Sequence, residues 1–333
     1  MLDEMNLKNN ELRKFYFSSF ILFCIFMIVV SVFQLFGLNN DYFGYQEIFT
    51  YNFGTKRKAT EPFFLLLRLI NDAYFNSSLI FIYLFTSCFS FYVKWNAFKR
   101  ITNRTPYLLF LFHTFCFFWI LEYTQIRASC SIAIFLYSIP DLIEKKSRQY
   151  LFKALIATLF HYSGFFMVIL FLYDRLIKHK TVYIVLPLFG FLFAIVCDNI
   201  LGAKLRALLH MIERSIGLNK SGNISDFMSP FNSKYLMLLL SFFLNSLFTP
   251  KSDRVNYTLM KSMSFGLCIF YWLNPIGLPV ISVRLAEFFT SVFVLYFFNN
   301  VRNIKIKEKK IVKFGWFMIV VLYSIASIRT GIL

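Results

Sequence analysis

Long apolar runs alternate with short polar segments along the whole chain. These runs are about 17–24 residues long, which is the length a helix needs to cross a hydrocarbon core of about 30 Å. Within such a core the backbone must satisfy its own hydrogen bonds, and the runs are too long for barrel strands. The pattern predicts spanning helices at about 15–37, 77–98, 106–122, 126–143, 151–173, 181–200, 231–249, 258–274, 280–299 and 311–328.

The predicted fold is therefore all-α, a polytopic transmembrane helical bundle of about ten spans. Hydrophobic residues make up 58% of the chain, which is far above the usage of soluble domains. We expect residues 1–333 to form a single integral membrane domain, with larger periplasmic loops at 38–61 and 201–230. The first apolar run, Phe15–Phe36, has no small-residue cleavage site after it and is expected to remain as a span.

The net charge of +18 comes from Lys and Arg in short loops rather than from a basic domain. No loop is long enough to hold a nucleic-acid-binding domain, so we expect no nucleic-acid partner. Positive loops mark the cytoplasmic face. Three groups are assigned to it: Lys94, Lys99, Arg100 and Arg104; Lys145, Lys146, Arg148 and Lys153; and Arg302, Lys305, Lys307, Lys309 and Lys310.

Ten simple spans would place the second and third of these groups on opposite faces. We expect the segment 151–177 to resolve this conflict, because His161, Tyr162, Ser163 and Gly164 interrupt it at mid-depth. A re-entrant pair of half-helices at this position would return Arg175 to the cytoplasmic face. Non-helical backbone at that depth is tolerated against protein or water.

Ionisable residues inside apolar segments are the first candidates for function. Arg127 begins a span, and an arginine there is either a fork for phosphate or an anchor at the interface. Arg284 and Glu287 are three residues apart on one helix face, which predicts an ion pair that positions the arginine or neutralises it. His161 is either a base or a histidine bonded to a carbonyl.

The first large loop and the short helix after it carry further polar residues. Carboxylates beside aromatic rings suit a sugar site, although tyrosines also form interfacial belts and Glu61 also suits a helix cap. Arg68 and Asp72 are four residues apart, as in an ion pair. The cysteines and histidines are scattered without metal-ligand spacing, so no metal and no cofactor is expected.

Five different short motifs occur one after another between residues 39 and 289. They are Asn39-Asn40-Asp41-Tyr42 with Tyr45, Glu61-Pro62-Phe63, Gln125-Ile126-Arg127-Ala128-Ser129, Phe160-His161-Tyr162-Ser163 and Arg284-Leu285-Ala286-Glu287-Phe288-Phe289. In this order and spacing they resemble the EpsG/Wzy family of bacterial polysaccharide polymerases.

The resemblance implies a GT-C-like glycosyltransferase of the bacterial inner membrane that acts at the periplasmic face. Donor and acceptor would both be undecaprenyl-diphosphate-linked oligosaccharides, with the bilayer and a polysaccharide chain-length regulator as further partners. Cations would help the diphosphate to leave, and a base would take the acceptor proton. The candidate bases are His161, Asp41 and Glu61; the diphosphate-binding candidates are Arg127, Arg284 and Arg68; the supporting residues are Glu287, Gln125, Tyr42, Tyr45 and Ser163.

Other membrane enzymes of sugar metabolism remain as alternatives. An O-antigen ligase, or another GT-C-type transferase, shares the donor and differs in its acceptor. A lipid-linked oligosaccharide flippase normally shows two similar halves, and this chain shows none. A membrane O-acetyltransferase would need a donor site at the cytoplasmic face, whereas the candidate residues are predicted at the opposite one.

Overall fold

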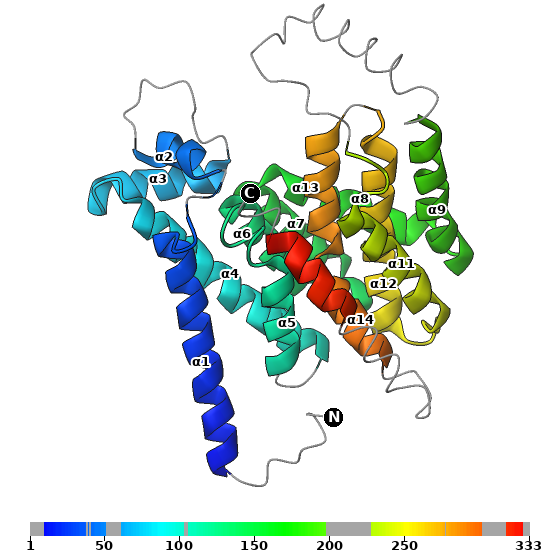
Figure 1. Ribbon diagram of the computed structural model, residues 1–333, viewed down its shortest axis with the longest axis horizontal. Coiled ribbons are helices and arrows are strands. Elements are labelled where there is room, and N and C mark those ends of the chain that lie inside the picture. The colour runs from blue at the N-terminus through cyan, green and yellow to red at the C-terminus, as the bar shows by residue number, and fades with distance from the viewer. Residues whose placement is uncertain are drawn as a thin grey trace, which may run out of the picture.

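The computed structural model describes residues 10–37, 39, 41–50, 61–102, 106–197, 228–276, 278–301 and 318–328. All regular elements in these ranges are helical (Figure 1). They are α1 Asn10–Phe33, α2 Tyr42–Thr50, α3 Pro62–Tyr74, α4 Leu79–Thr102, α5 Tyr107–Phe117, α6 Ile126–Ile143, α7 Ser147–Phe160, the 3-10 helix η1 Tyr162–Phe165, α8 Phe166–Leu176, α9 Lys180–Val196, α11 Ser233–Leu247, α12 Arg254–Leu273, α13 Pro279–Thr290, α14 Phe293–Val301 and the segment Met318–Ile328.

Several helices begin at residues that either lack a backbone N–H or accept a hydrogen bond from one of the unpaired N–H groups of the first turn. Pro62 begins α3, where the missing N–H of proline costs no hydrogen bond. The side chains of Asn232 and Asp253 accept hydrogen bonds from Lys234 N and Asn256 N, both at 3.1 Å, and so cap α11 and α12. The short helix expected at 62–75 is thus present as α3, and the loop before it contains α2.

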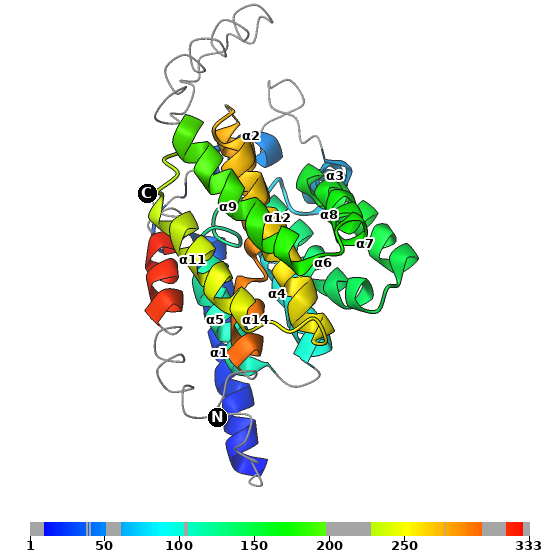
Figure 2. The ribbon, with the colours of Figure 1, turned by 90° about the vertical axis from the view of Figure 1, so that its right-hand side faces the viewer.

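Helices α7 and α8 form an antiparallel hairpin at the segment where a pair of half-helices was predicted, whereas its re-entrant placement in a membrane stays a prediction. Arg175 donates to Ser147 Oγ at 2.5 Å, and Tyr150 donates to Met167 O at 3.2 Å. The fourteen residues of α7 rise about 21 Å, less than a hydrocarbon core of about 30 Å. Figure 2 shows α3, α7 and α8 grouped on one side of the bundle. The hairpin therefore begins and ends at the same end of the molecule.

Gly164 allows a tight turn in this hairpin. A Cβ at position 164 would lie 2.5 Å from the backbone nitrogen of Thr158, which no real side chain tolerates without movement of the backbone. The Gly164 N–H donates to His161 O at 2.8 Å and fixes the turn after α7. The glycine therefore lets η1 pack directly on the last turns of α7.

The bundle has two chemically distinct ends. We call the end where α6 begins and α7 finishes the His161 end. The opposite end, where α6 finishes and α7 begins, is the Asp141 end. Arg127 and Asp141 lie fourteen residues apart on α6, which corresponds to a rise of about 21 Å. The two ends are thus separate sites on one core helix.

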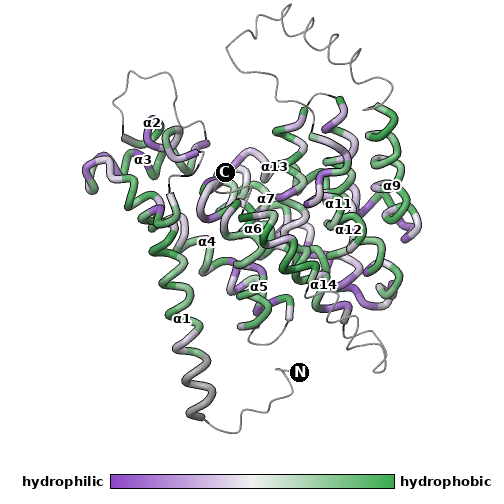
Figure 3. Tube along the Cα trace, viewed as in Figure 1, coloured by the Kyte–Doolittle hydropathy of each residue, from purple (hydrophilic) through white to green (hydrophobic). Residues whose placement is uncertain are grey.

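Two helices in the described ranges are long and apolar enough to cross a membrane, namely Ile126–Ile143 and Pro279–Asn300. Both coincide with predicted spans. Shorter apolar helices are Phe17–Phe33, Tyr107–Phe117, Lys180–Val196, Ser233–Leu247 and Met318–Ile328. Hydrophobic residues cover most of α9 and much of α1 (Figure 3). The helical, partly apolar structure fits a membrane protein, whereas the total of about ten spans stays a prediction.

The interpretation of the positive groups needs two corrections. Lys94 and Lys153 were assigned to loops, but they lie within α4 and α7 and are paired with acidic residues. Lys94 is only 2% exposed, because Glu122 offers it a buried carboxylate. Arg104, the group from Arg302 to Lys310 and most of the loop 201–230 lie outside the described residues.

Candidate active site

Glu61 joins two predicted site residues that are far away along the chain. Its Oε2 accepts a hydrogen bond from Arg127 Nη1 at 2.6 Å. Its Oε1 lies 3.0 Å from His161 Nδ1. The Glu61 side chain is only 3% exposed, so both contacts are largely shielded from solvent. Three of the predicted site residues therefore meet at the His161 end.

Local sequence explains why these side chains can meet. Glu61 precedes proline, which favours the extended backbone observed at φ −76° and ψ 130°. His161 ends α7 with φ −160° and ψ 133°, although its N–H still bonds to Ala157 O at 2.9 Å. Each residue thus lies at a helix boundary and extends its side chain away from the helix. The interruption expected at His161 is the feature that exposes it to Glu61.

Electrostatics keep the Glu61 carboxyl ionised. Burial alone would raise the pKa of its carboxyl, but the His161 hydrogen bond and the Arg127 charge outweigh burial and lower it to about 2. A carboxylate accepts but does not donate, so His161 Nδ1 must carry the shared hydrogen. In a neutral imidazole the other nitrogen, Nε2, is then an acceptor. Glu61 therefore fixes the tautomer that can receive a proton at Nε2.

Arg127 keeps donors that Glu61 does not use. Its guanidinium carbon lies 5.7 Å from the centroid of the Tyr45 ring, and its side chain is 21% exposed. Within the described part of the chain, its buried Nε has no hydrogen-bond partner. A guanidinium has five N–H groups, so Arg127 can bind an anion while it remains paired with Glu61.

Tyr45 marks a meeting point of three predicted charges. Burial raises the pKa of its hydroxyl to about 12, and the charges of Arg127, Asp41 and Arg284 all act on it. Tyr45 also packs edge-on against Tyr83, with ring centroids 6.1 Å apart, and Tyr42 stacks on the same ring at 6.3 Å. Arg127, Asp41 and Arg284 therefore all lie close enough to Tyr45 for their charges to act on its hydroxyl.

The predicted pair of Arg284 and Glu287 is wrong. Glu287 instead interacts with Lys234 Nζ at 2.5 Å and with Gln125 Nε2 at 3.2 Å. Lys234 comes from α11, and at 4% exposure it needs a buried carboxylate more than a half-buried arginine does. Among the residues that the structure describes, Arg284 makes no ion pair. Within the described ranges, its guanidinium is thus able to bind a ligand.

Two other candidates lie apart from the Glu61 contacts. Arg68 forms the predicted ion pair with Asp72, with 3.6 Å between Nε and Oδ2. This pair lies within α3, and Arg68 is seven residues, or about two helical turns, from Glu61. Ser163 lies in η1 next to His161, and its carbonyl accepts the N–H of Phe166. Arg68 and Ser163 therefore lie close along the chain to Glu61 and His161, respectively.

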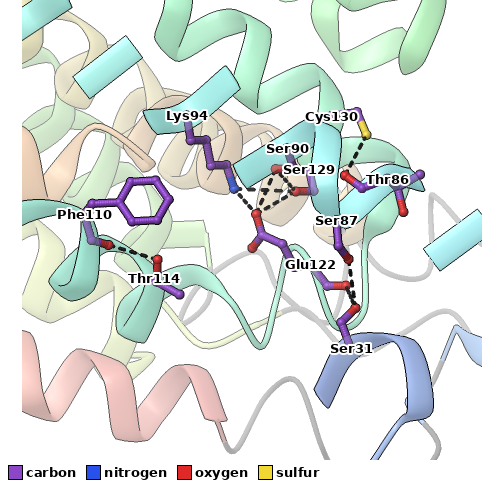
Figure 4. A network of polar contacts seen from close by, with 10 residues as sticks. All are labelled: Ser31, Thr86, Ser87, Ser90, Lys94, Phe110, Thr114, Glu122, Ser129 and Cys130. Carbon is purple, nitrogen blue, oxygen red and sulfur yellow. Dashed lines mark hydrogen bonds and ion pairs between the residues drawn. The ribbon is translucent and has the colours of Figure 1, made fainter. Parts of the chain in front are cut away.

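The sequence interpretation missed a network of polar contacts around Glu122, in the turn before α6, which Figure 4 shows. Glu122 Oε1 accepts from Ser90 Oγ at 2.9 Å and from Ser129 Oγ at 3.0 Å, and it pairs with Lys94. The Glu122 carbonyl also accepts from Ser31 Oγ at 2.6 Å. These bonds tie the turn before α6 to α1 and α4. The sequence feature that could have predicted this network is a polar stripe at four-residue spacing in an apolar helix, made of Thr86, Ser90 and Lys94.

No group of three or more His, Cys, Asp or Glu side chains in the described ranges is placed to hold a metal ion. The site instead offers cations from arginine. The expected metal independence stays a prediction.

The chain as a whole is similar to a known protein family. A family model described as "EpsG family" matches residues 17–332, which is nearly the whole chain. The resemblance carried by the ordered motifs is thereby confirmed. No curated protein and no solved structure matches the chain.

Proposed function

The chain belongs to the EpsG family, and on that premise we propose that it is a surface-polysaccharide polymerase. The family fits a polysaccharide-polymerase-like membrane protein. In the proposed reaction, repeat units carried on undecaprenyl diphosphate are joined by glycosyl transfer. The observation that carries the proposal is the Glu61 carboxylate bound to both Arg127 and His161. Arg284, which makes no ion pair with the described residues, acts with Arg127 on the same Tyr45 hydroxyl.

His161 is the proposed base. The acceptor hydroxyl gives its proton to His161 Nε2 while its oxygen forms a bond to the anomeric carbon of the donor. The bond between that carbon and the diphosphate oxygen breaks, and undecaprenyl diphosphate leaves with the electron pair. The charged imidazolium is stabilised by the Glu61 carboxylate, 3.0 Å away. A single displacement of this kind inverts the anomeric configuration.

Arg127 and Arg284 are the proposed cations for the leaving diphosphate. Fixed donors that face developing negative charge contribute rate factors of about 10²–10³ each. Glu61 already neutralises Arg127 in part, so Arg284 supplies the larger uncompensated charge. Arg68 is a weaker candidate, because Asp72 is its partner on α3. Asp41 remains an alternative base near Tyr45.

Positive charge supports an orientation in the inner membrane. The cations at the Asp141 end include Lys99, Lys145 and Arg175, which the positive-inside rule assigns to the cytoplasm. The His161 end then faces the periplasm, where lipid-linked repeat units are polymerised.

Deletion of the gene tests the proposed class of reaction. Loss of a polymerase should leave single repeat units attached to the lipid core, seen as collapse of the long ladder on a gel of surface polysaccharide. Loss of a ligase would instead leave no units attached, and loss of a flippase would trap units inside the cell. Either of the last two patterns would contradict the proposal.

A further inference from the structure

A cavity of about 330 Å³ opens at the Asp141 end, opposite the candidate active site. It lies between the base of the α7–α8 hairpin, the last turn of α6 and the first turns of α12. Its lining carries the cations Lys145, Arg175, Lys178 and Lys261 and the carboxylates Asp141 and Asp174. The proposed polymerase reaction uses none of these residues.

Both carboxylates of the lining are already occupied. Asp141 is fully buried and pairs with Arg100 at 3.2 Å and with Lys153. Asp174 pairs with Lys261 at 2.5 Å, and that ammonium also lies 4.5 Å from the centroid of the Tyr257 ring. The acidic groups therefore have no charge left with which to neutralise further cations.

Three cations of the lining have no acidic partner in the described ranges. Arg175 donates to Ser147 Oγ and lies 4.9 Å from the centroid of the Phe171 ring. Lys145 and Lys178 are exposed at the rim. Ser147 begins α7, whose positive dipole end faces the same region. The cavity thus combines an aromatic floor with net positive charge, the chemistry that binds a phosphate group.

The hairpin next to the cavity is apolar on its outer surface. Phe152 and Leu155 of α7 are 63% and 57% exposed, and Leu172 and Leu176 of α8 are 48% and 77% exposed. Leu176 directly follows Arg175 of the cavity. Such side chains suit contact with acyl chains and would not assist the binding of a free anion. This apolar surface favours a lipid headgroup, rather than free phosphate in solution, as the source of the phosphate group.

We propose that this cavity binds the phosphate of an anionic phospholipid headgroup, with the acyl chains of that lipid along the α7–α8 hairpin. Arg175, Lys145 and Lys178 hold the phosphate. Basic pockets between helices at the cytoplasmic side of a membrane are known to take such headgroups. The bound lipid would hold the base of the hairpin whose tip carries His161.

The test uses the full chain purified in detergent and titrated with phosphatidylglycerol or phosphatidylcholine, with bound lipid counted by native mass spectrometry. The Lys145→Gln/Lys178→Gln variant removes two cations of the rim. The Lys99→Gln/Lys251→Gln variant removes the same charge from exposed positions at the same end but outside the lining. A third arm replaces lipid with inorganic phosphate and follows the melting temperature.

Wild type should bind one saturable phosphatidylglycerol, and the rim variant should bind it about 30-fold more weakly, at about one factor of five per lysine. The Lys99→Gln/Lys251→Gln variant should bind like wild type. Equal binding of phosphatidylcholine, or equal loss in both double variants, would overturn the proposal. Stabilisation by inorganic phosphate equal to that by phosphatidylglycerol would overturn the assignment to a lipid.

Discussion

Removal of the Lys94 ammonium should destabilise the protein strongly, because it strands a buried carboxylate. Lys94 and Glu122 are 2% and 4% exposed, so water cannot replace the lost partner. Breaking a buried pair from one side typically costs about 3–5 kcal/mol. In Lys94→Met, Glu122 keeps the hydroxyls of Ser90 and Ser129, which favours the lower part of that range, about 3 kcal/mol.

The reciprocal change and the double variant complete a thermodynamic cycle. Glu122→Leu leaves Lys94 with Ser129 Oγ at 3.5 Å and should cost about 4–5 kcal/mol. Lys94→Met/Glu122→Leu removes both charges, and Ser90 and Ser129 can still bond to each other at 2.8 Å. The double variant should therefore lie within about 1–2 kcal/mol of wild type, since buried pairs are often replaceable by apolar residues.

Unfolding by sodium dodecyl sulfate in mixed micelles, followed by tryptophan fluorescence, measures these differences. Lys99→Met is the matched control on the same helix, because Lys99 is exposed and should change stability by less than about 0.5 kcal/mol. The reasoning is refuted if Lys94→Met behaves like this control. It is also refuted if the double variant loses the sum of the two single losses.

Two further predictions concern the hairpin and the Glu61 carboxylate. Gly164→Ala should lower the apparent melting temperature by the equivalent of about 1–3 kcal/mol, because its Cβ would meet the Thr158 backbone, while Ser163→Ala should not; equal melting of both variants would contradict this. Glu61 has a folded pKa of about 2, below its ordinary 4.5, so its contribution to stability is complete above pH about 4.5 and is lost as pH falls toward 2. The difference in melting temperature between wild type and Glu61→Gln should therefore shrink between pH 6 and pH 3, and a constant difference would argue against the depressed pKa.

Sequence patterns located the central residues because each one lies at the start of an apolar segment or at a break within one. Glu61 precedes a proline, Arg127 begins a core helix, and His161 starts a polar step in the middle of an apolar run. The break at His161 also predicted the hairpin, since the positive groups required the chain to return. Features of this kind depend on residues that are neighbours along the chain, so the sequence alone reveals them.

Partner choice could not be derived in the same way. Spacing paired Arg284 with Glu287, but Lys234 from another helix reaches that carboxylate. Likewise, a rule based on loop charges assigns Lys94 to the cytoplasmic face, because the rule takes no account of the contact between Lys94 and Glu122. These contacts join segments 28 and 53 residues apart, so only the packing of the helices decides them.

The central claim is that His161 and Arg284 act directly on lipid-linked repeat units. The most direct measurement reconstitutes the purified protein in vesicles with undecaprenyl-diphosphate-linked repeat units and follows product length on a gel. We predict long chains from wild type and from Arg148→Ala, an exposed control at the opposite end of α7 from His161. His161→Ala and Arg284→Ala should each slow chain growth by about 10²-fold or more. Chain growth at the wild-type rate in both of these variants would contradict the account.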